Sequence, residues 1–422
     1  MNRFFLLLLA LLSTGCLLLL SSCSDDYKAS VTELRLVQVK PVNVYSGEIA
    51  TILGRNFSPV PEENEVYIDG CQATVIESTK DDMKIILPEV APGKYPIQVI
   101  TPAGELTGLE INYLKKPDHD YIVQTIVGQK GVYAMTDGVG TEATTKLPTG
   151  IAFAPDGSIW FTERGYNWIR RISADYTVTS LVDVAVDSGS AIWQGAFDLE
   201  GNYYFADKAK GLLRVLKKDA QKAETVASGM KSPMNVAVDK SGAIYVSARD
   251  NKAVYRLEEG GSLSTFCSLK VSPNYITFDK QGRMIVGTSG SYCIVEVSAD
   301  GLEQRVIAGD GTKGTEYYDG EAGNPTSAKV GATFGIAAGS DGALYISDNT
   351  YHCIRKLTPS ADGDYAKGTL ETIAGSGKSG YSDGIGLKAS FNSPYEIIIT
   401  DDCKTMYVAG AVNYLIRRIT VK

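Results

Sequence analysis

From about residue 121 to its end, the chain repeats a pair of short apolar runs, and this repeat limits the fold more than any other feature. In each copy the second run begins ten residues after the first, which leaves room for two strands and a tight turn. The turn glycines before the first five copies lie 44, 41, 40 and 60 residues apart. Because intervals of roughly 40–45 residues are typical of four-stranded propeller blades, the six copies predict six blades. The first runs of the copies are residues 159–162, 203–206, 244–247, 284–287, 344–347 and 406–409.

We expect four antiparallel strands in each blade, named a to d from the axis outward. The sixth copy lacks a strand d, because only residues 420–422 follow its strand c. An unpaired strand at residues 122–127 matches residues 371–374, the strand d of the fifth copy. We therefore expect residues 122–127 to form the outer strand of the last blade, which closes the ring and removes its free edge.

Two segments of this repeat carry a family resemblance. Residues 148–152 read Pro-Thr-Gly-Ile-Ala, and Asp348-Asn349 precedes Ile354-Arg355-Lys356. On these pieces the repeats resemble NHL repeats. The resemblance implies a propeller over residues 121–422 and does not specify an activity.

Residues 31–115 alternate apolar and polar side chains in short runs bounded by turns, as in a small β-sandwich. This segment resembles an IPT/TIG domain, which implies an immunoglobulin-like fold that mostly acts as a spacer or protein contact. Residues 116–120 then form a linker, so the chain is expected to be all-β. The matching pieces are Pro41, Gly47 and residues 51–57, 66–73 and 102–104.

The N-terminus has the pattern of an exported leader, with Arg3 followed by an apolar stretch over residues 4–20. Leu20-Ser21-Ser22-Cys23 resembles the lipobox of bacterial lipoproteins, which implies cleavage after residue 22 and acylation of Cys23. A second box ending at Cys16 would leave residues 17–20 exposed behind the anchor. An ordinary signal peptide or a transmembrane helix is the alternative.

The residues that follow Cys23 predict the location of the protein. Residues 23–30 are a tether whose acidic pair, Asp25-Asp26, resembles the surface-export signal of Bacteroidetes lipoproteins. We therefore expect a lipid anchor in the outer membrane and exposure at the cell surface. The acidic pair could also be plain solvated tether.

Charge and histidine content exclude several functions. The net charge is −8, which argues against nucleic acid as a partner because phosphate binding usually needs a basic surface. The chain has only two histidines, His119 and His352, which excludes a histidine-rich metal centre. We expect no cofactor, with calcium as the one alternative.

Three loops between strand d and the next strand a are long, at residues 128–147, 309–331 and 375–392. They precede blades 1, 5 and 6, which are neighbours in a closed ring, so we expect them to form one wall on the face that carries the b–c loops. Each contains an Asp-Gly pair, which builds turns and could also bind calcium, although no acidic cluster has EF-hand spacing. These pairs begin at Asp137, Asp319 and Asp383.

Polar residues gather where strand b ends and where strand a begins, and both places lie on the face that carries the b–c loops. Their mixed charge could orient the hydroxyls of a sugar, or the side chains could bond the amides of local turns. A carboxylate or calcium centre could be built only from Glu396, Asn235, Asp207 and Asp348. The residues directly after strand b are Glu163, Asp207, Ala248, Thr288, Asp348 and Gly410, followed by Arg164, Lys208, Arg249, Ser289, Asn349 and Ala411.

Aromatic residues that do not recur in the repeat are candidates for stacking on sugar rings. Trp193 is expected in the loop before blade 2, Tyr166 and Trp168 in or beside the b–c loop of blade 1, and Tyr317 and Tyr318 in the blade 5 loop. Plain loop packing is the alternative for each. Five aromatics share one repeat position and are expected to pack between blades, namely Trp160, Tyr204, Tyr245, Tyr345 and Tyr407.

These patterns favour a binding protein over an enzyme. The main hypothesis is a lipid-anchored surface protein that captures a glycan or a partner protein on the b–c face. A calcium-assisted propeller lactonase or lyase is the alternative. A scaffold that binds only neighbouring proteins is a third hypothesis.

Overall fold

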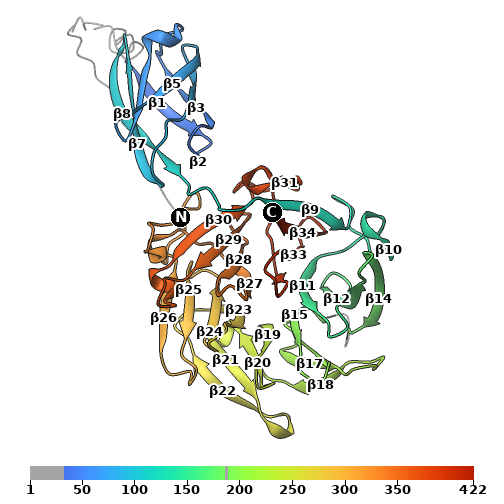
Figure 1. Cartoon of the computed structure of the whole chain (residues 1–422). Coiled ribbons are helices and arrows are strands. Elements are labelled where there is room, and N and C mark those ends of the chain that lie inside the picture. Colours follow the sequence, from blue (N-terminus) through green and yellow to red (C-terminus); the bar gives the residue numbers. More distant parts are fainter. Residues whose placement is uncertain (1–32, 186–188) are drawn as a thin grey trace, which may run out of the picture. The chain divides into compact units, whose positions relative to one another are not determined.

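The computed structural model describes residues 33–185 and 189–422, and nearly all of the regular structure in these ranges is β-strand (Figure 1). The leader, the tether and Cys23 lie outside the described residues. No helix in the described ranges is long and apolar enough to cross a membrane. The chain divides into two compact units between Tyr113 and Leu114, which are described separately.

The N-terminal unit is a β-sandwich around one apolar core, and all but one of its strand pairs are antiparallel. Strand β5 pairs with β4 through Cys71–Ala73 and with β6 through Thr74–Ser78, so it passes from one half of the sandwich to the other. Ile68, Met83 and Val99 are fully buried between the halves. In ladder order the strands are β1 (Arg35–Lys40), β3 (Ile49–Arg55), β6 (Asp82–Ile86), β5 (Cys71–Ser78), β4 (Glu65–Ile68), β7 (Gly93–Thr101), β8 (Gly104–Tyr113) and β2 (Asn43–Val44).

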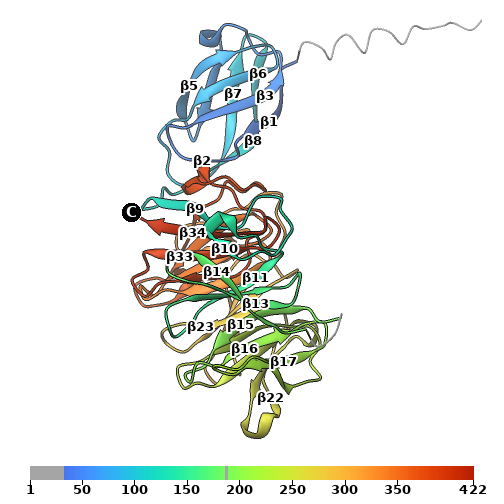
Figure 2. The same cartoon turned by 90° about the vertical axis from the view of Figure 1, so that its right-hand side faces the viewer.

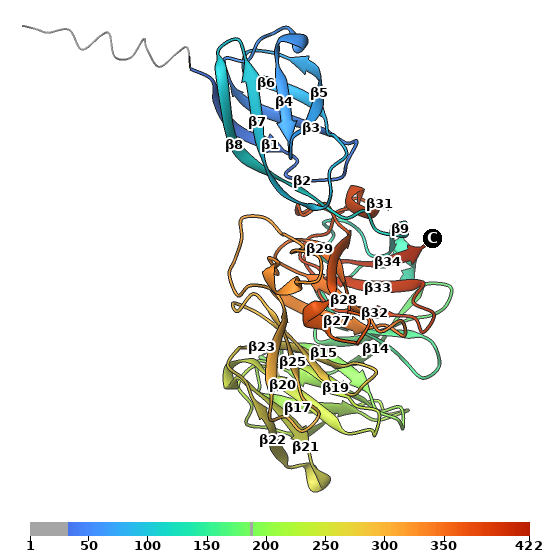
Figure 3. The same cartoon turned by 60° about the vertical axis from the view of Figure 1, so that its left-hand side comes forward.

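The C-terminal unit is a six-bladed propeller whose blades each have strands a to d in antiparallel order (Figures 1 and 3). Blade 1 consists of β11 (Pro148–Phe153), β12 (Ile159–Glu163), β13 (Trp168–Ile172) and β14 (Thr177–Asp183). Blade 2 consists of β15 (Ile192–Phe197), β16 (Tyr203–Asp207), β17 (Leu212–Leu216) and β18 (Glu224–Ala227). Blade 3 consists of β19 (Pro233–Val238), β20 (Ile244–Ala248), β21 (Ala253–Leu257) and β22 (Leu263–Ser268).

The remaining blades follow the same plan. Blade 4 consists of β23 (Pro273–Phe278), β24 (Met284–Thr288), β25 (Ile294–Val297) and β26 (Gln304–Ala308). Blade 5 consists of β27 (Thr333–Ala338), β28 (Leu344–Asp348), β29 (Cys353–Thr358) and β30 (Thr369–Ala374). Blade 6 consists of β32 (Ile397–Ile399), β33 (Thr405–Gly410), β34 (Leu415–Val421) and, from the start of the unit, β9 (Tyr121–Val127).

Strand β9 closes the ring, as the sequence predicted (Figure 2). It pairs antiparallel with β34, with Val123 opposite Ile419 and Val127 opposite Ile416. Its side chains Val123 and Val127 are buried, so the last blade gains both a paired edge and part of its core. The all-β fold with a closed six-bladed propeller is thereby confirmed.

The recurring aromatic position of strand b packs against the next blade, as predicted. Trp160 contacts Phe197 of blade 2 edge-on at 5.0 Å between ring centroids. Tyr245 contacts Phe278 of blade 4 in the same way at 5.1 Å. These rings therefore hold neighbouring blades together, as expected for this repeat position.

Each of the three long loops folds back on the outer strand of its own blade. Adjacent loops also contact one another, as the expected wall requires: Nζ of Lys130 lies 3.3 Å from the ring centroid of Tyr381, and Gly377 packs against the ring of Tyr317. β10 (Gly138–Val139) pairs with the outer strand β14, and β31 (Gly384–Ile385) pairs with β9. In each loop the Asp of the Asp-Gly pair forms an ion pair with an arginine of strand c at 2.7–2.9 Å. The register of strands c and d shifts at each of these arginines, which leaves a main-chain N–H and a hydroxyl of strand d for the same carboxylate. The pairs and outer-strand partners are Asp137 with Arg170 and Ser180, Asp319 with Arg355 and Thr372, and Asp383 with Arg417 and Thr125.

Candidate functional site

An aromatic cluster lies where the first strands of the blades reach the axis on the b–c face. Trp193 of blade 2 stacks on Phe334 of blade 5 at 5.9 Å between centroids, and Tyr395 of blade 6 contacts both rings. Met234 of blade 3 packs into the same cluster. Side chains from four blades therefore meet around one point.

Trp193 was predicted in a loop, but it belongs to strand β15 and its side chain is only 3% exposed. The register of β15 against β16 shifts between Ile192 and Gly195, so pairing resumes at Ile192 opposite Asp207. This shift extends the strand beyond its apolar run, which is why the sequence pattern alone placed Trp193 outside it.

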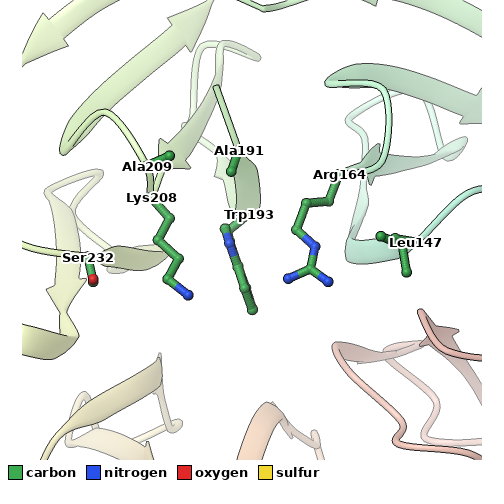
Figure 4. A pocket seen from close by; sticks show the side chains of 7 residues that line it. All are labelled: Leu147, Arg164, Ala191, Trp193, Lys208, Ala209 and Ser232. Atoms are coloured by element: carbon green, nitrogen blue, oxygen red, sulfur yellow. The ribbon is translucent and has the colours of Figure 1, made fainter. Parts of the chain in front are cut away.

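Two cations cover the indole of Trp193. The guanidinium carbon of Arg164 lies 4.8 Å from the ring centroid, and Nζ of Lys208 lies 4.7 Å from it. Figure 4 shows Lys208 and Arg164 on either side of the ring. Cation–π contacts with these two groups therefore occupy the ring, although Trp193 still lines the pocket. Stacking of a sugar on Trp193 stays a prediction.

Arg164 and Lys208 line a pocket of about 520 Å³ that opens at the axis (Figure 4). Arg164 directly follows β12 and Lys208 directly follows β16, so both occupy the first position after strand b. The repeat pattern predicted this repeat position for Arg164 and Lys208. From this position, however, only Arg249 and Asn349 were predicted to bind a ligand. The pocket is lined by Leu147, Arg164, Ala191, Trp193, Lys208, Ala209 and Ser232.

The positive charge of this pocket is not balanced by any carboxylate among its described lining residues. Within residues 33–185 and 189–422, neither Arg164 nor Lys208 forms an ion pair. Burial lowers the pKa of Lys208, and the nearby Arg249 and Arg164 lower it further, against a weaker opposing effect of Asp250. Arg249 itself is paired with Asp250 at 3.0 Å.

The carboxylates at the end of strand b are buried and bonded to main-chain amides. Glu163 accepts the N–H of Lys146 at 2.6 Å, and burial raises its pKa to about 7. Asp207 accepts the N–H of Ala191 at 3.1 Å. These two side chains hold the loops that carry Leu147 and Ala191, so they shape the wall of the pocket.

Blade 5 repeats this arrangement at Asp348. Its carboxylate accepts the N–H groups of Gly331 and Tyr351 and lies 3.4 Å from Arg355. Its neighbour Asn349 donates to the carbonyl of Pro394 at 3.2 Å. Direct binding of a ligand by these residues stays a prediction.

The polar residues nearer the axis do not form a metal centre in the described part of the chain. Glu396 accepts the N–H of Ile151 at 2.8 Å and the hydroxyl of Tyr275 at 2.9 Å, and burial raises its pKa to about 8. Asn235 accepts the N–H of Ile276 at 3.0 Å. No group of three or more His, Cys, Asp or Glu within the described ranges is arranged to hold a metal. The four residues predicted as a possible calcium centre, Glu396, Asn235, Asp207 and Asp348, therefore each bond to a different part of the chain.

The other predicted aromatics lie away from the pocket wall. Tyr166 is exposed and has Nζ of Lys146 over its ring at 3.9 Å. Trp168 begins strand β13 and is half-buried. Tyr317 is buried against Tyr351, while the carbonyl of Tyr318 accepts from Arg355.

Comparison with known proteins identifies the N-terminal unit. Residues 36–110 match the IPT/TIG domain model. A curated chloroplast protein of Arabidopsis thaliana, SUPPRESSOR OF QUENCHING 1, is 34% identical over 85 residues. That match covers 20% of this chain and only 7% of the plant protein.

Solved structures share both units of the fold. A protein of unknown function from Bacteroides thetaiotaomicron has a TM-score of 0.61 at 22% identity and covers 92% of this chain and 98% of its own. An auxiliary nutrient binding protein from Bacteroides ovatus has a TM-score of 0.60 at 19% identity, with the same coverage. At this identity the similarity establishes the fold.

Proposed function

We propose that this chain is a lipid-anchored cell-surface protein that captures a nutrient glycan on the b–c face of its propeller. The observation that carries the proposal is the pocket at the axis, where Trp193 holds Arg164 and Lys208 at the wall of an open 520 Å³ depression. A site assembled from three blades and kept open is typical of small-molecule recognition. The nutrient-binding name of the Bacteroides ovatus relative supplies the hypothesis that the ligand is a nutrient.

The pocket is better suited to binding than to catalysis by its own side chains. Arg164 and Lys208 can donate hydrogen bonds, but the described residues of the pocket wall include no carboxylate, histidine or thiol to accept a proton. The buried acids Glu163 and Asp207 are bonded to main-chain amides outside the lining. The geometry therefore does not favour the lactonase or lyase that the sequence left open.

The IPT/TIG domain and the leader supply the rest of the proposal. A lipid on Cys23 would hold the N-terminus at the outer membrane, and the sandwich would act as a spacer between the anchor and the propeller. Capture of a partner protein on the same face is the competing form of this function.

The test uses the mature chain with Cys23→Ser, screened by calorimetry against neutral and acidic plant, algal and host oligosaccharides. We expect at least one glycan to bind, and we expect it to bind at the pocket. Trp193→Ala should therefore weaken its binding. If no glycan in the panel binds, glycan capture is wrong, and a pull-down from the cell envelope then tests the partner protein.

A further inference from the structure

We propose that the pocket beside Trp193 recognises an anionic group of its ligand, so that the captured glycan carries a carboxylate or a sulfate ester. This inference rests on the proposed function and specifies the class of glycan. Net charge does not indicate such a site, because the chain as a whole carries a charge of −8. The positive charge is local and arises from how the blades converge.

The two cations are held in place without a neutralising partner in the described part of the chain. Arg164 and Lys208 lie on the indole of Trp193, which is 3% exposed and packed on Phe334, so the ring fixes where both charged groups sit. Unpaired cations in a partly buried site raise the free energy of the empty pocket. A bound anion would relieve this cost, and the relief would add to its binding free energy.

The carboxylate of Asp250, which lies near Lys208, already has other hydrogen-bond partners. Asp250 accepts from Arg249 at 3.0 Å and from the hydroxyl of Ser232 at 2.5 Å. It therefore neutralises Arg249 at the rim and holds Ser232 at the pocket wall. Arg164 and Lys208 remain available to an anion that enters from outside.

The chemistry of the two side chains indicates the kind of anion. The planar guanidinium of Arg164 matches two oxygens of a carboxylate or sulfate, while Lys208 supplies a compact charge with rotatable donors. The pocket volume of about 520 Å³ accommodates a sugar residue around such a group. A uronic acid or a sulfated sugar has both the anionic group and the sugar ring around it.

The experiment compares ligands that differ only in charge. Calorimetry at low salt measures the mature Cys23→Ser chain with oligogalacturonate, with the same oligomer fully methyl-esterified, and with neutral and sulfated galactan oligosaccharides. We expect the acidic or the sulfated oligomer to bind at least about tenfold more tightly than its uncharged counterpart, the effect of about one charge-assisted hydrogen bond. Added salt should weaken this binding.

Matched variants connect the effect to the pocket. Arg164→Gln and Lys208→Gln should each weaken binding of the charged oligomer about tenfold or more. Lys208→Arg, which keeps the charge, should retain most of it. Lys240→Gln is the control, because Lys240 is an exposed lysine in the a–b turn of blade 3 on the opposite face. Circular dichroism and thermal unfolding show whether each variant is folded.

The outcomes separate the inference from the function on which it rests. Preference for the carboxylate or for the sulfate supports the inference and identifies the source of the anion. Equal binding of charged and uncharged oligomers, unchanged by Arg164→Gln and Lys208→Gln, overturns the inference while glycan capture stands. Binding of no oligomer of either kind removes glycan capture and the inference together.

Discussion

Glu396 accepts a hydrogen bond from the hydroxyl of Tyr275 at 2.9 Å, although the two residues are 121 positions apart and come from blades 6 and 4. The contact reaches past blade 5, which lies between these two blades in the ring. It joins blades that are not neighbours in the ring, so it depends on closure of the whole unit. Its strength should depend on the protonation of Glu396.

Stability of the propeller should fall with rising pH because of Glu396. Burial raises its pKa from 4.5 to about 8, so the folded chain binds this proton more tightly than the unfolded chain. The stabilisation is complete below about pH 4.5 and is lost as the pH rises through about 8. Glu396→Gln mimics the protonated acid and should remove this pH dependence.

Urea unfolding at pH 5, 7 and 9 measures the effect. All three tryptophans of the chain, Trp160, Trp168 and Trp193, lie in the propeller, so their fluorescence reports on that unit alone. We expect the stability of the parent relative to Glu396→Gln to decrease between pH 5 and 9 by on the order of a few kcal/mol. Glu303→Gln, at an exposed turn, is the control. Parallel pH profiles of parent and Glu396→Gln would contradict the prediction.

Asp319→Asn should loosen the long loop of blade 5. Asp319 pairs with the fully buried Arg355 at 2.7 Å and also accepts from Thr372, so the variant leaves a buried guanidinium with one less carboxylate. We expect a loss of about 1–3 kcal/mol in the free energy of unfolding. Hydrogen exchange across residues 309–331 should become faster. Asp401→Asn, at an exposed turn, should change neither quantity.

Calcium should have little effect on stability. The loop carboxylates Asp137, Asp319 and Asp383 already bind arginines and outer-strand amides, so a calcium ion would have to displace these partners. Calorimetric unfolding with EDTA and with millimolar calcium should give melting temperatures within about 1 °C of each other. A melting temperature that rises with calcium concentration would show that a site exists.

The repeat could be predicted from the sequence because its signals are local. Turn glycines and apolar runs recur at nearly constant spacing. The sixth copy lacks a strand d, and residues 122–127 were the unpaired segment that resembled one. The same local pattern failed at Trp193, where a register shift adds residues to the strand. Periodicity counts residues along one strand and does not register a change in its pairing.

The pocket could be predicted only in part. The position after strand b correctly placed Arg164 and Lys208 on the b–c face, but neither was chosen as a site residue. The contact of Arg164 with Trp193 depends on the angle between blades 1 and 2, which no spacing in the sequence reports. The contact of Lys208 with Trp193 lies within blade 2 and depends on the register shift that brings Trp193 into β15. The contact of Glu396 with Tyr275 was missed because it requires the closed ring.

Val123→Asp should open the ring at its closure. Val123 is 1% exposed in strand β9 and lies opposite Ile419, so the new carboxylate would be buried without a partner. We expect a loss of more than about 3 kcal/mol, or failure to fold. Gln124→Asp, at the adjacent exposed position, is the control. Tryptophan fluorescence during thermal unfolding distinguishes the two, and equal stability would mean that β9 does not hold the ring closed.

Cys23→Ser should abolish lipid attachment in a bacterium that processes lipoproteins. The proposed lipobox places cleavage directly before Cys23, whereas the competing box ends at Cys16. Because acylation requires the thiol, labelled palmitate should enter the parent and Cys16→Ser but not Cys23→Ser. Loss of label only in Cys16→Ser would move the anchor to that residue and leave the apolar residues 17–20 on the mature chain. Absence of label from all three would indicate an ordinary signal peptide, and the proposed surface tether would then have no anchor.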